Sequence, residues 1–391
     1  MIKIKSKNKC CGCYACANIC PKKCIEFYED FEGFKYPKVN KNLCVNCHLC
    51  EKVCQYIKNE NFERKKEPLA YAVKAKNEII RYNSSSGGFF PLISKSVLNK
   101  NGIVYGVAMQ NNQTKASTIR INNISQLSLL NGSKYIQADI DYIFLKVKQD
   151  LINGKMVLFS GVPCQIIALK NFLNKDYENL FCVEVICHGV PSPALWKKYL
   201  KFLQQENKSQ VNYVNFRDKK NGWKNFGVSI HGENICQYSD LNNDPYMIMF
   251  LQNYCLRPSC YNCKAKKIET KADITIGDFW GIEKIIPEID DDKGISLVLV
   301  NNSKGNFLIK DIKNEIISYK IPYILAIKGN AAYAKSVKKP IERNNFFKNM
   351  NKMNFQQLKK KYCKISKYNI FKIKLKKTLL YKIYKKCLKS N

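Results

Sequence analysis

The sequence lacks the apolar segments that direct a protein into or across a membrane. No apolar run reaches about 18 residues, the length that spans a bilayer as a helix. The N-terminal segment MIKIKSKNK leads to Cys10 without an apolar stretch, so no secretory signal is predicted. From these two absences we expect a cytoplasmic protein.

Acidic residues are scarce. The chain has 31 Asp and Glu against 66 Lys and Arg, a formal net charge of +35. Such an excess is typical of proteins that bind nucleic acid, an anionic membrane surface or an acidic protein. A lysine-rich composition with solvated side chains also explains it, and we favour this interpretation. We do not expect nucleic-acid binding, because no recognised binding motif accompanies the charge.

The C-terminal segment 343–391 has no acidic residue at all. Between residues 359 and 389, lysines are mixed with Tyr, Ile, Leu and Phe, which predicts basic amphipathic helices. Such helices either contact an anionic membrane or an acidic redox partner, or pack their apolar face on the core. We favour packing and treat 336–391 as a basic helical tail.

Cysteine, in contrast, is abundant. The 391 residues include 19 cysteines, and 46% of all residues are apolar, enough for a large core and two or three domains. In a short secreted chain so many cysteines would indicate disulfides. Here the chain is long, no signal is predicted and the cysteines are grouped, so we expect them to bind metal.

One cysteine pattern occurs twice within the first 55 residues. In each copy three cysteines are separated by two residues, and a fourth follows after three more. The copies are Cys10, Cys13, Cys16 and Cys20, and Cys44, Cys47, Cys50 and Cys54. This spacing is typical of two-cluster bacterial ferredoxins, in which the fourth cysteine ligates the other [4Fe-4S] cluster. Zinc sites use two Cys-x2-Cys pairs with a longer gap, so iron-sulfur clusters are predicted.

Crossed ligation assigns the ligands of both clusters. The first cluster would take Cys10, Cys13, Cys16 and Cys54, and the second would take Cys44, Cys47, Cys50 and Cys20. It also ties the two halves into one compact fold, which a segment this short needs. Cys11 and Cys24 lie outside the pattern and are interpreted as small packing residues. His48 lies inside the second loop, beside the ligands.

Beyond a polar linker at 56–68, strand-like and helical segments alternate. Strands are expected at 69–74, 102–108, 155–159 and 180–185, a helix at 166–173, and a turn with a short strand at 30–37. The alternation predicts an α/β or α+β domain with a mainly buried sheet. Ligands of such sheets bind at the strand ends.

Two turns of small residues are candidate anion sites. Residues 84–88, SSSGG, precede an apolar stretch that predicts a helix, and backbone N–H groups at a helix N-terminus suit a phosphate. Residues 132–135, GSKY, form a second turn with one cation. A generic loop ahead of a helix would look the same, so the turns alone do not decide.

Four later cysteines form a second candidate metal site. Cys260 and Cys263 make one Cys-x2-Cys pair, while Cys164 and Cys187 each follow a predicted strand. The spacing does not show that they converge. A third cluster, a zinc site, a redox dithiol and unrelated buried cysteines all remain open.

Two polar residues near these cysteines have a functional and a structural interpretation. Asp278 ends a predicted strand, where it would orient a ligand or cap the turn, and capping is commoner. His188 would donate a proton, bind metal or form only a local hydrogen bond.

Seven short motifs carry a resemblance to a known family. They are SSSGGFF (84–90), GSKYIQ (132–137), SGVPCQ (160–165), ICHGVPSP (186–193), NFRDKKNGWKNF (215–226), LRPSCYNC (256–263) and DITIGDFWGIEK (273–284). Together with the two cluster motifs, they resemble the beta subunit of coenzyme F420 hydrogenases and dehydrogenases. The chain is most similar to the bacterial stand-alone branch with an N-terminal ferredoxin domain, from about residue 8 to residue 310.

The resemblance implies an α+β organisation in three parts. A 2[4Fe-4S] ferredoxin-type domain (1–60) would precede a larger mixed α/β domain for FAD and iron-sulfur (61–335) and the basic tail (336–391). The resemblance implies a third [4Fe-4S] cluster on Cys164, Cys187, Cys260 and Cys263. It makes the two turns candidates for holding FAD through Ser85, Ser86, Gly87, Gly88, Gly132, Ser133, Lys134 and Tyr135.

The implied activity is that of an iron-sulfur flavoprotein oxidoreductase. Clusters move single electrons, whereas a flavin accepts two singly and passes them on as a hydride. Electrons would pass between the ferredoxin clusters and FAD, and then to or from an F420-like deazaflavin or another organic substrate, a sugar-linked one included. Reduced ferredoxin or another redox protein would be the partner. The alternatives are a non-catalytic electron-transfer subunit and a binding protein with structural or redox-sensing clusters. No residue is assigned to catalysis.

Overall fold

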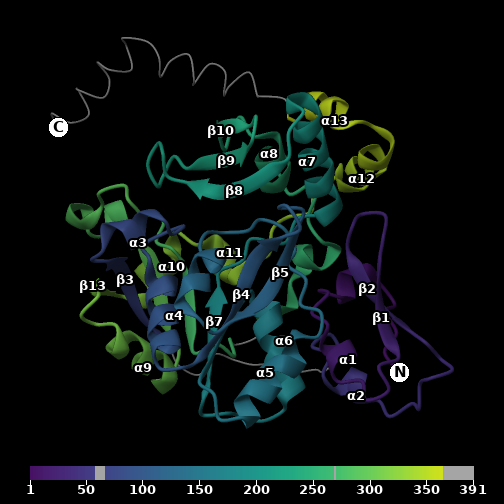
Figure 1. Ribbon diagram of the computed structural model, residues 1–391, viewed down its shortest axis with the longest axis horizontal. Coiled ribbons are helices and arrows are strands. Elements are labelled where there is room, and N and C mark those ends of the chain that lie inside the picture. Colours follow the sequence, from purple (N-terminus) through teal and green to yellow (C-terminus); the bar gives the residue numbers. More distant parts are fainter. Residues whose placement is uncertain (58–66, 268–269, 364–391) are drawn as a thin grey trace.

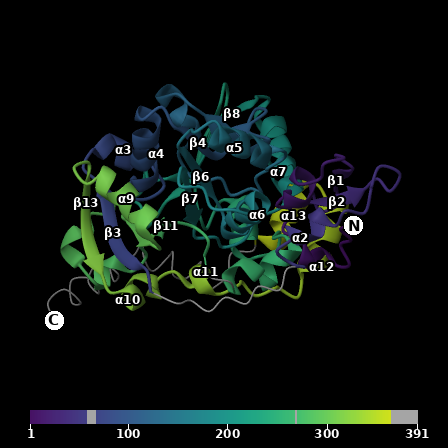
Figure 2. The same cartoon turned by 90° about the horizontal axis from the view of Figure 1, so that it is seen from below.

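The computed structural model describes residues 1–57, 67–267 and 270–363 (Figure 1). A two-stranded hairpin, an eight-stranded central sheet and a three-stranded sheet organise these residues. Figures 1 and 2 both place the hairpin at the opposite end of the molecule from β3 (Leu69–Ala75) and β13 (Ile316–Ile321). In the described part, no helix has both the length and the apolar character needed to cross a membrane.

The N-terminal domain is built as two similar halves. Its elements are α1 (Ala15–Asn18), β1 (Ile25–Glu29), β2 (Lys35–Val39) and α2 (Leu49–Lys52). The strands pair antiparallel, and each short helix follows a residue with left-handed backbone, Tyr14 or His48, with φ 61° in both. The repeat in the sequence is therefore also a repeat in backbone conformation.

The central sheet has the strand order β13-β3-β12-β11-β7-β6-β4-β5. Its inner strands and their neighbours are β4 (Ile103–Gln110), β5 (Lys115–Ile121), β6 (Val157–Gly161), β7 (Leu180–Val185), β11 (Ile274–Asp278) and β12 (Ser296–Val300). β4, β6, β7 and β11 are parallel, and the flanking strands pair antiparallel. The carboxyl ends of the parallel strands meet at one edge of the sheet, where such sheets bind ligands.

Helices cover both faces of the central sheet. They are α4 (Phe89–Asn99) and α9 (Ser303–Asp311) on one face, and α5 (Ile143–Ile152) and α6 (Pro163–Leu173) on the other. The side chains of successive strand residues point to opposite faces of the sheet. Tyr105 and Phe159 pack with α5 and α6, whereas Val104 and Leu158 pack with α4. All four side chains are fully buried.

The three-stranded sheet and four helices form a further layer beside the central sheet (Figure 1). These elements are α7 (Pro193–Asn207), β8 (Val211–Asp218), β9 (Gly227–Gly232), β10 (Cys236–Asp240), α8 (Pro245–Leu251), α12 (Arg343–Lys352) and α13 (Phe355–Tyr362). Phe355 of α13 stacks on Tyr199 with ring centroids 4.9 Å apart, and Leu358 is fully buried. The described start of the basic tail thus packs on the core. Most of the stretch 359–389, for which packing was favoured from the sequence, lies outside the described residues, so that expectation stays a prediction.

Most segments predicted from the sequence coincide with observed elements. The strand predicted at 180–185 is β7, and the other predicted strands differ from β3, β4 and β6 by a residue or two at their ends. The helix predicted at 166–173 begins earlier, at Pro163, because proline suits a first helical position. Most of the predicted linker lies outside the described residues. The remaining elements are η1 (Lys7–Lys9), α3 (Glu78–Tyr82), η2 (Ile124–Leu130), η3 (Pro258–Asn262), η4 (Lys264–Lys267), η5 (Ile282–Lys284), η6 (Pro287–Ile289), α10 (Tyr323–Lys328) and α11 (Ala331–Ala334).

Candidate redox sites

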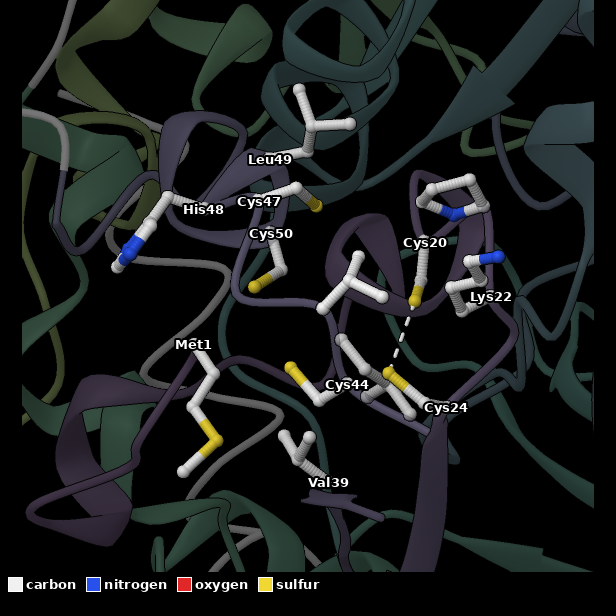
Figure 3. A pocket seen from close by; sticks show the side chains of 13 residues that line it. Met1, Cys20, Lys22, Cys24, Val39, Cys44, Cys47, His48, Leu49 and Cys50 are labelled. Atoms are coloured by element: carbon white, nitrogen blue, oxygen red, sulfur yellow. Dashed lines mark hydrogen bonds between the residues drawn. The ribbon is translucent and has the colours of Figure 1, made fainter. Parts of the chain in front are cut away.

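A small cavity in the N-terminal domain is lined by cysteines from both halves of the repeat (Figure 3). Cys20 comes from the first half, and Cys44, Cys47 and Cys50 come from the second. Much of the remaining wall is apolar and includes Met1, Ile25, Val39, Val45 and Leu49. The four cysteines predicted for the second cluster therefore surround one cavity.

A fifth thiol reaches this cavity. Cys24 also lines it, with its Sγ 3.3 Å from the Sγ of Cys20 (Figure 3). Burial first and the nearby Cys20 second together raise the pKa of Cys24 to about 12. Its interpretation as a packing residue is thus incomplete, since the thiol faces the predicted ligands. His48 is exposed, and its Nδ1 lies 2.7 Å from Glu51.

The cysteines predicted for the first cluster also converge. Burial raises the pKa of Cys16, and the nearby thiols of Cys13, Cys10 and Cys54 raise it further. The pKa of Cys54 rises to about 11, because of burial first and Cys13 second. Thiols perturb each other in this way only at close range. Cys54, from the second half of the repeat, therefore lies with the cysteines of the first half.

The four later cysteines come together at the carboxyl edge of the central sheet. Cys164 lies in the first turn of α6 after β6, Cys187 follows β7, and Cys260 and Cys263 lie in and just after η3. Burial raises the pKa of Cys187 to about 12, with Cys260 and Cys263 contributing. A hydrogen bond with Cys11 lowers the pKa of Cys164, but burial and the other three thiols raise it overall. Parallel neighbouring strands bring Cys164 and Cys187 together, which the spacing did not reveal.

Three groups of four thiols fit iron-sulfur clusters in their chemistry. In the described residues, no group of three His, Cys, Asp or Glu side chains is arranged to hold a single metal ion, so the fit is argued from the donor set. Thiolates hold the iron of a cluster. In the protein without clusters, burial and neighbouring thiols oppose the formation of these thiolates. A cationic centre shared by four thiols would relieve both effects.

Cys11 lies where the N-terminal domain meets the third group of cysteines. The Cys13 thiol lowers the pKa of Cys11, whereas the Cys164 thiol and burial raise it overall. Gln55 Nε2 donates to Cys11 Sγ over 3.3 Å and to the Cys164 carbonyl over 3.0 Å. The sequence interpretation of Cys11 as a packing residue missed this position. A ligand loop of the first cluster therefore contacts a candidate ligand of the third.

A cavity of about 650 Å³ lies beside the third group of cysteines. Cys187 forms part of its wall, together with Val162 after β6 and Asp278 at the end of β11. Cofactor pockets commonly have volumes of roughly 300 to 1,000 Å³ and occur at such strand ends. The cavity thus has a suitable size and place for a flavin close to a cluster.

The two small-residue turns meet in the wall of this cavity. Ser85 Oγ lies 2.9 Å from Ser133 Oγ. Seven predicted flavin contacts line the cavity: Ser85, Ser86, Gly88, Gly132, Ser133, Lys134 and Tyr135. The eighth, Gly87, is not in the wall, because its Cα faces β3, where an added Cβ would lie 2.2 Å from the Val73 carbonyl oxygen. Gly87 therefore shapes the turn from behind.

The composition of the wall fits a flavin nucleotide. α4 begins at Phe89, directly after Gly88, so unpaired N–H groups of its first turn lie at the cavity, as phosphate binding requires. Gly132, with φ 79°, has no atom within 4 Å of an added Cβ and leaves open space. Burial lowers the pKa of Lys134 to about 7, and its Nζ donates to the Asn131 carbonyl over 2.6 Å.

Arg217 of β8 is a site residue that the sequence reasoning missed. Its Nη2 donates to Asp278 Oδ1 over 2.8 Å and to the Ser85 carbonyl over 3.3 Å. Its guanidinium lies 3.6 Å from the centre of the Phe226 ring. Its Nε is buried and has no hydrogen-bond partner in the described structure. A buried, partnerless donor beside a cavity is a position that a bound ligand can satisfy.

The hydrogen bonds of the Asp278 side chain come from other side chains, not from the turn that it was expected to cap. Besides Arg217, it accepts a hydrogen bond from Trp223 Nε1 over 2.8 Å. Trp223 stacks on Trp280 with centroids 4.8 Å apart and planes 5° apart. His188 lines the cavity, and its Nε2 lies 2.7 Å from Asn253 Oδ1, so the local hydrogen bond considered from the sequence is present. Burial lowers the pKa of His188.

Comparison with known proteins agrees with this organisation. Residues 9–57 match the 4Fe-4S dicluster domain, and residues 154–321 match the C-terminal part of the coenzyme F420 hydrogenase/dehydrogenase beta subunit. A chain of the xenon-derivatised F420-reducing [NiFe] hydrogenase complex from Methanosarcina barkeri is similar, with a TM-score of 0.46 and 13% sequence identity. The match covers 76% of this chain and 91% of that chain. No curated protein matches in sequence. The chain therefore carries a 4Fe-4S dicluster domain at residues 9–57 and, at residues 154–321, a segment similar to the C-terminal part of the coenzyme F420 hydrogenase/dehydrogenase beta subunit.

Proposed function

We propose that the chain is an iron-sulfur flavoprotein oxidoreductase that passes electrons between its dicluster domain and an organic substrate through FAD. The observation that carries this proposal is the position of Cys187. It lines the large cavity and also belongs to the third group of thiols, whose member Cys164 contacts Cys11 of the dicluster domain. One continuous set of contacts thus joins the cysteine groups to the cavity.

The cysteines divide into three ligand sets in this proposal. The dicluster domain holds one [4Fe-4S] cluster on Cys10, Cys13, Cys16 and Cys54, and one on Cys20, Cys44, Cys47 and Cys50. The third set holds a cluster on Cys164, Cys187, Cys260 and Cys263. Cys47 is exposed, so the second cluster lies nearest to a redox partner such as reduced ferredoxin. Electrons entering there would pass through the first and third clusters.

The large cavity holds FAD in this proposal. The flavin supplies the exchange between single electrons and a hydride. The turns at Ser85–Gly88 and Gly132–Tyr135 and the first turn of α4 bind its phosphates. Arg217, fixed by Asp278, offers its free Nε to the bound nucleotide. The surrounding aromatic side chains exclude water from the ring.

The substrate belongs to a class that can exchange a hydride with a flavin. The matched family favours an F420-like deazaflavin, and another organic substrate is compatible with the cavity. The alternative function is that of a non-catalytic electron-transfer subunit. The observation that supports this alternative is the match to the beta subunit of an enzyme. Turnover by the isolated chain with a reduced donor and F420 would support the first function. Activity that appears only with a partner subunit would support the second.

Iron and released flavin per chain, measured after anaerobic purification, test the proposal. We expect about twelve iron atoms, as three cubanes require, and one FAD. Cys187→Ser should lose about four iron atoms, whereas Cys182→Ala, in the same strand region but outside the cysteine group, should lose none. About eight iron atoms and no flavin in the unaltered protein would contradict the proposal.

A further inference from the structure

Arg257 is a buried cation beside a candidate ligand of the first cluster. Its side chain is fully buried, and its Nε donates to the Cys10 carbonyl over 2.7 Å. Its Nη2 lies 3.7 Å from Cys10 Sγ, within hydrogen-bonding distance for sulfur. The same Nη2 donates to the Lys35 carbonyl over 2.9 Å, and Nη1 donates to Gln137 Oε1 over 3.0 Å. Arg257 thus reaches from the cavity domain into the dicluster domain.

The first ligand loop is shaped around this guanidinium. Gly12 has φ 69°, and an added Cβ would lie 2.8 Å from Arg257 Nη1. The guanidinium carbon of Arg257 lies over the Tyr36 ring, 4.4 Å from the ring centre. A side chain at position 12 would displace the arginine. The close fit indicates that the loop and the arginine work as one unit.

Sulfur provides the negative charge next to Arg257. In the described structure, no carboxylate lies within salt-bridge distance of its guanidinium, unlike that of Arg343, which pairs with Glu32 over 2.6 Å. A guanidinium is not deprotonated in proteins, so Arg257 keeps its charge. It contacts Cys10 and lies three positions before Cys260, which are candidate ligands of two clusters.

We propose that Arg257 raises the reduction potential of the first cluster through its charge and its hydrogen bond to Cys10 Sγ. A reduced cluster carries one more negative charge, and a cation hydrogen-bonded to a ligand sulfur stabilises that charge. This inference rests on the cluster assignment of the proposed function. Arg257 acts on the cluster through Cys10 and is therefore a positioning residue.

The second cluster lacks an equivalent arrangement among the described residues. Cys50 Sγ accepts a hydrogen bond from the neutral backbone N–H of Ile2 over 3.2 Å. The nearby N-terminal ammonium is paired with Glu51 over 3.2 Å, which offsets its charge. Lys22 also lines the second cavity, but within the described residues its side chain makes no hydrogen bond to a cluster cysteine. A charge-assisted hydrogen bond to a ligand sulfur therefore distinguishes the first cluster, and the effect of Arg257 should be confined to it.

A redox titration followed by electron paramagnetic resonance tests the inference on the full, cluster-loaded protein. Cys47→Ser identifies the signal of the second cluster. In Arg257→Gln we expect the ratio of reduced to oxidised first cluster at a given potential to fall about tenfold, which is about 59 mV for one electron. The second cluster serves as an internal reference and should not shift. Arg257→Lys, which keeps the charge, should shift the first cluster less.

Arg120→Gln is the matched control, because Arg120 pairs with Asp150 away from the dicluster domain and does not contact a cluster cysteine. It should leave both potentials unchanged. An unshifted first cluster in Arg257→Gln, or an equal shift in Arg120→Gln, would overturn the inference. Should Arg257→Gln not load its clusters, protein labelled with ¹⁵N-guanidino arginine should show nitrogen coupling to the reduced first cluster, and no coupling would equally overturn it. Iron content of the unaltered protein tests the proposed function separately.

Discussion

At the scale of single residues, the large cavity depends on one buried ion pair. Arg217 and Asp278 come from two different sheets, and their contact holds Arg217 against Phe226 at the cavity. The charged pair is nearly buried, with exposed side-chain fractions of 3% and 17%. A buried charge that keeps one unpaired donor is costly for folding alone. We therefore attribute the arrangement to binding.

Replacing Arg217 by lysine tests this role. Lysine keeps a positive charge beside Asp278 but removes Nε and the planar guanidinium. Loss of one hydrogen bond to a charged group of the ligand should weaken FAD binding about 10- to 100-fold. Equilibrium titration of flavin-free protein with FAD measures this change. Arg120→Lys, which alters a pair with Asp150 away from the cavity, should bind FAD normally. Equal affinity of Arg217→Lys and the unaltered protein would refute the role.

Sequence reasoning could identify cysteines by spacing but not residues brought together by the fold. The repeat indicated which cysteines of the dicluster domain belong together, because crossed ligation follows from the spacing. The gathering of Cys164, Cys187 and Cys260 depends on parallel β6 and β7 being neighbours, which no spacing encodes. Arg217 lies in the quoted motif at 215–226, but nothing in the sequence distinguished it there, because a charged residue in a strand is usually solvent-exposed and its partner Asp278 is distant in sequence.

At the scale of elements, the β1–β2 hairpin is held to the rest of the chain by a second buried ion pair. Glu32, in the turn between the strands, accepts two hydrogen bonds from Arg343 of α12, over 2.9 and 2.6 Å. Arg343 also donates to the Leu256 carbonyl, next to Arg257 in the chain. The pair therefore fastens the dicluster domain close to the junction between the cysteine groups.

Glu32→Gln should destabilise this attachment. The substitution leaves the Arg343 charge buried without a counter-ion, which typically costs about 3 to 5 kcal/mol. Denaturant unfolding under anaerobic conditions measures the loss. Glu315→Gln is the control, because Glu315 and Lys95 form an exposed pair that contributes about 1 kcal/mol or less. Similar small losses in both variants would show that the Glu32–Arg343 pair does not fasten the domain.

Helix α8 begins at a buried carboxyl that should make stability depend on pH. Asp244 Oδ1 accepts from the Met247 N–H and Oδ2 from the Tyr199 hydroxyl, both over 2.8 Å. Burial raises the pKa of Asp244 to about 6, above the unfolded value of about 3.9. Between these values the folded state binds more protons, so the contribution of Asp244 to unfolding free energy falls as pH rises.

Asp244→Asn should remove this dependence. The stability of the variant relative to the unaltered protein should increase as the pH rises from 5 to 7. Thermal unfolding of both proteins at each pH measures this change. Asp176→Asn changes an exposed carboxyl and should show no such trend. A constant difference between Asp244→Asn and the unaltered protein at both pH values would contradict the assignment.

Element prediction succeeded where a segment forms its own pattern. The strand at 180–185 (LFCVEV) begins with four apolar residues that are all buried, as expected for a parallel strand inside a sheet covered on both faces. The three-stranded sheet was not predicted, because β10 (CQYSD) has no clear alternation and is largely half-buried. The antiparallel flanks of the central sheet also escaped prediction, since strand direction is set by tertiary packing.

At the scale of the whole molecule, the three cysteine groups and the cavity form one series. The second group lies in the dicluster domain with exposed Cys47, the first contacts Cys11, and the third borders the cavity through Cys187. In this series the second group precedes the first, the reverse of their order in the sequence, and Cys20 and Cys54 exchange partners. The cysteine groups therefore form a series that runs from the exposed Cys47 to the cavity.

Rapid mixing with pre-reduced ferredoxin tests this path most directly, because a protein donor cannot enter the cavity. We follow cluster and flavin absorbance in the unaltered protein and in Cys187→Ser reconstituted with FAD, with Cys182→Ala as the control. The account predicts that dicluster reduction remains in all three proteins, whereas flavin reduction slows at least about 100-fold in Cys187→Ser alone. Flavin reduction at an unchanged rate in Cys187→Ser would contradict the path through the third cluster.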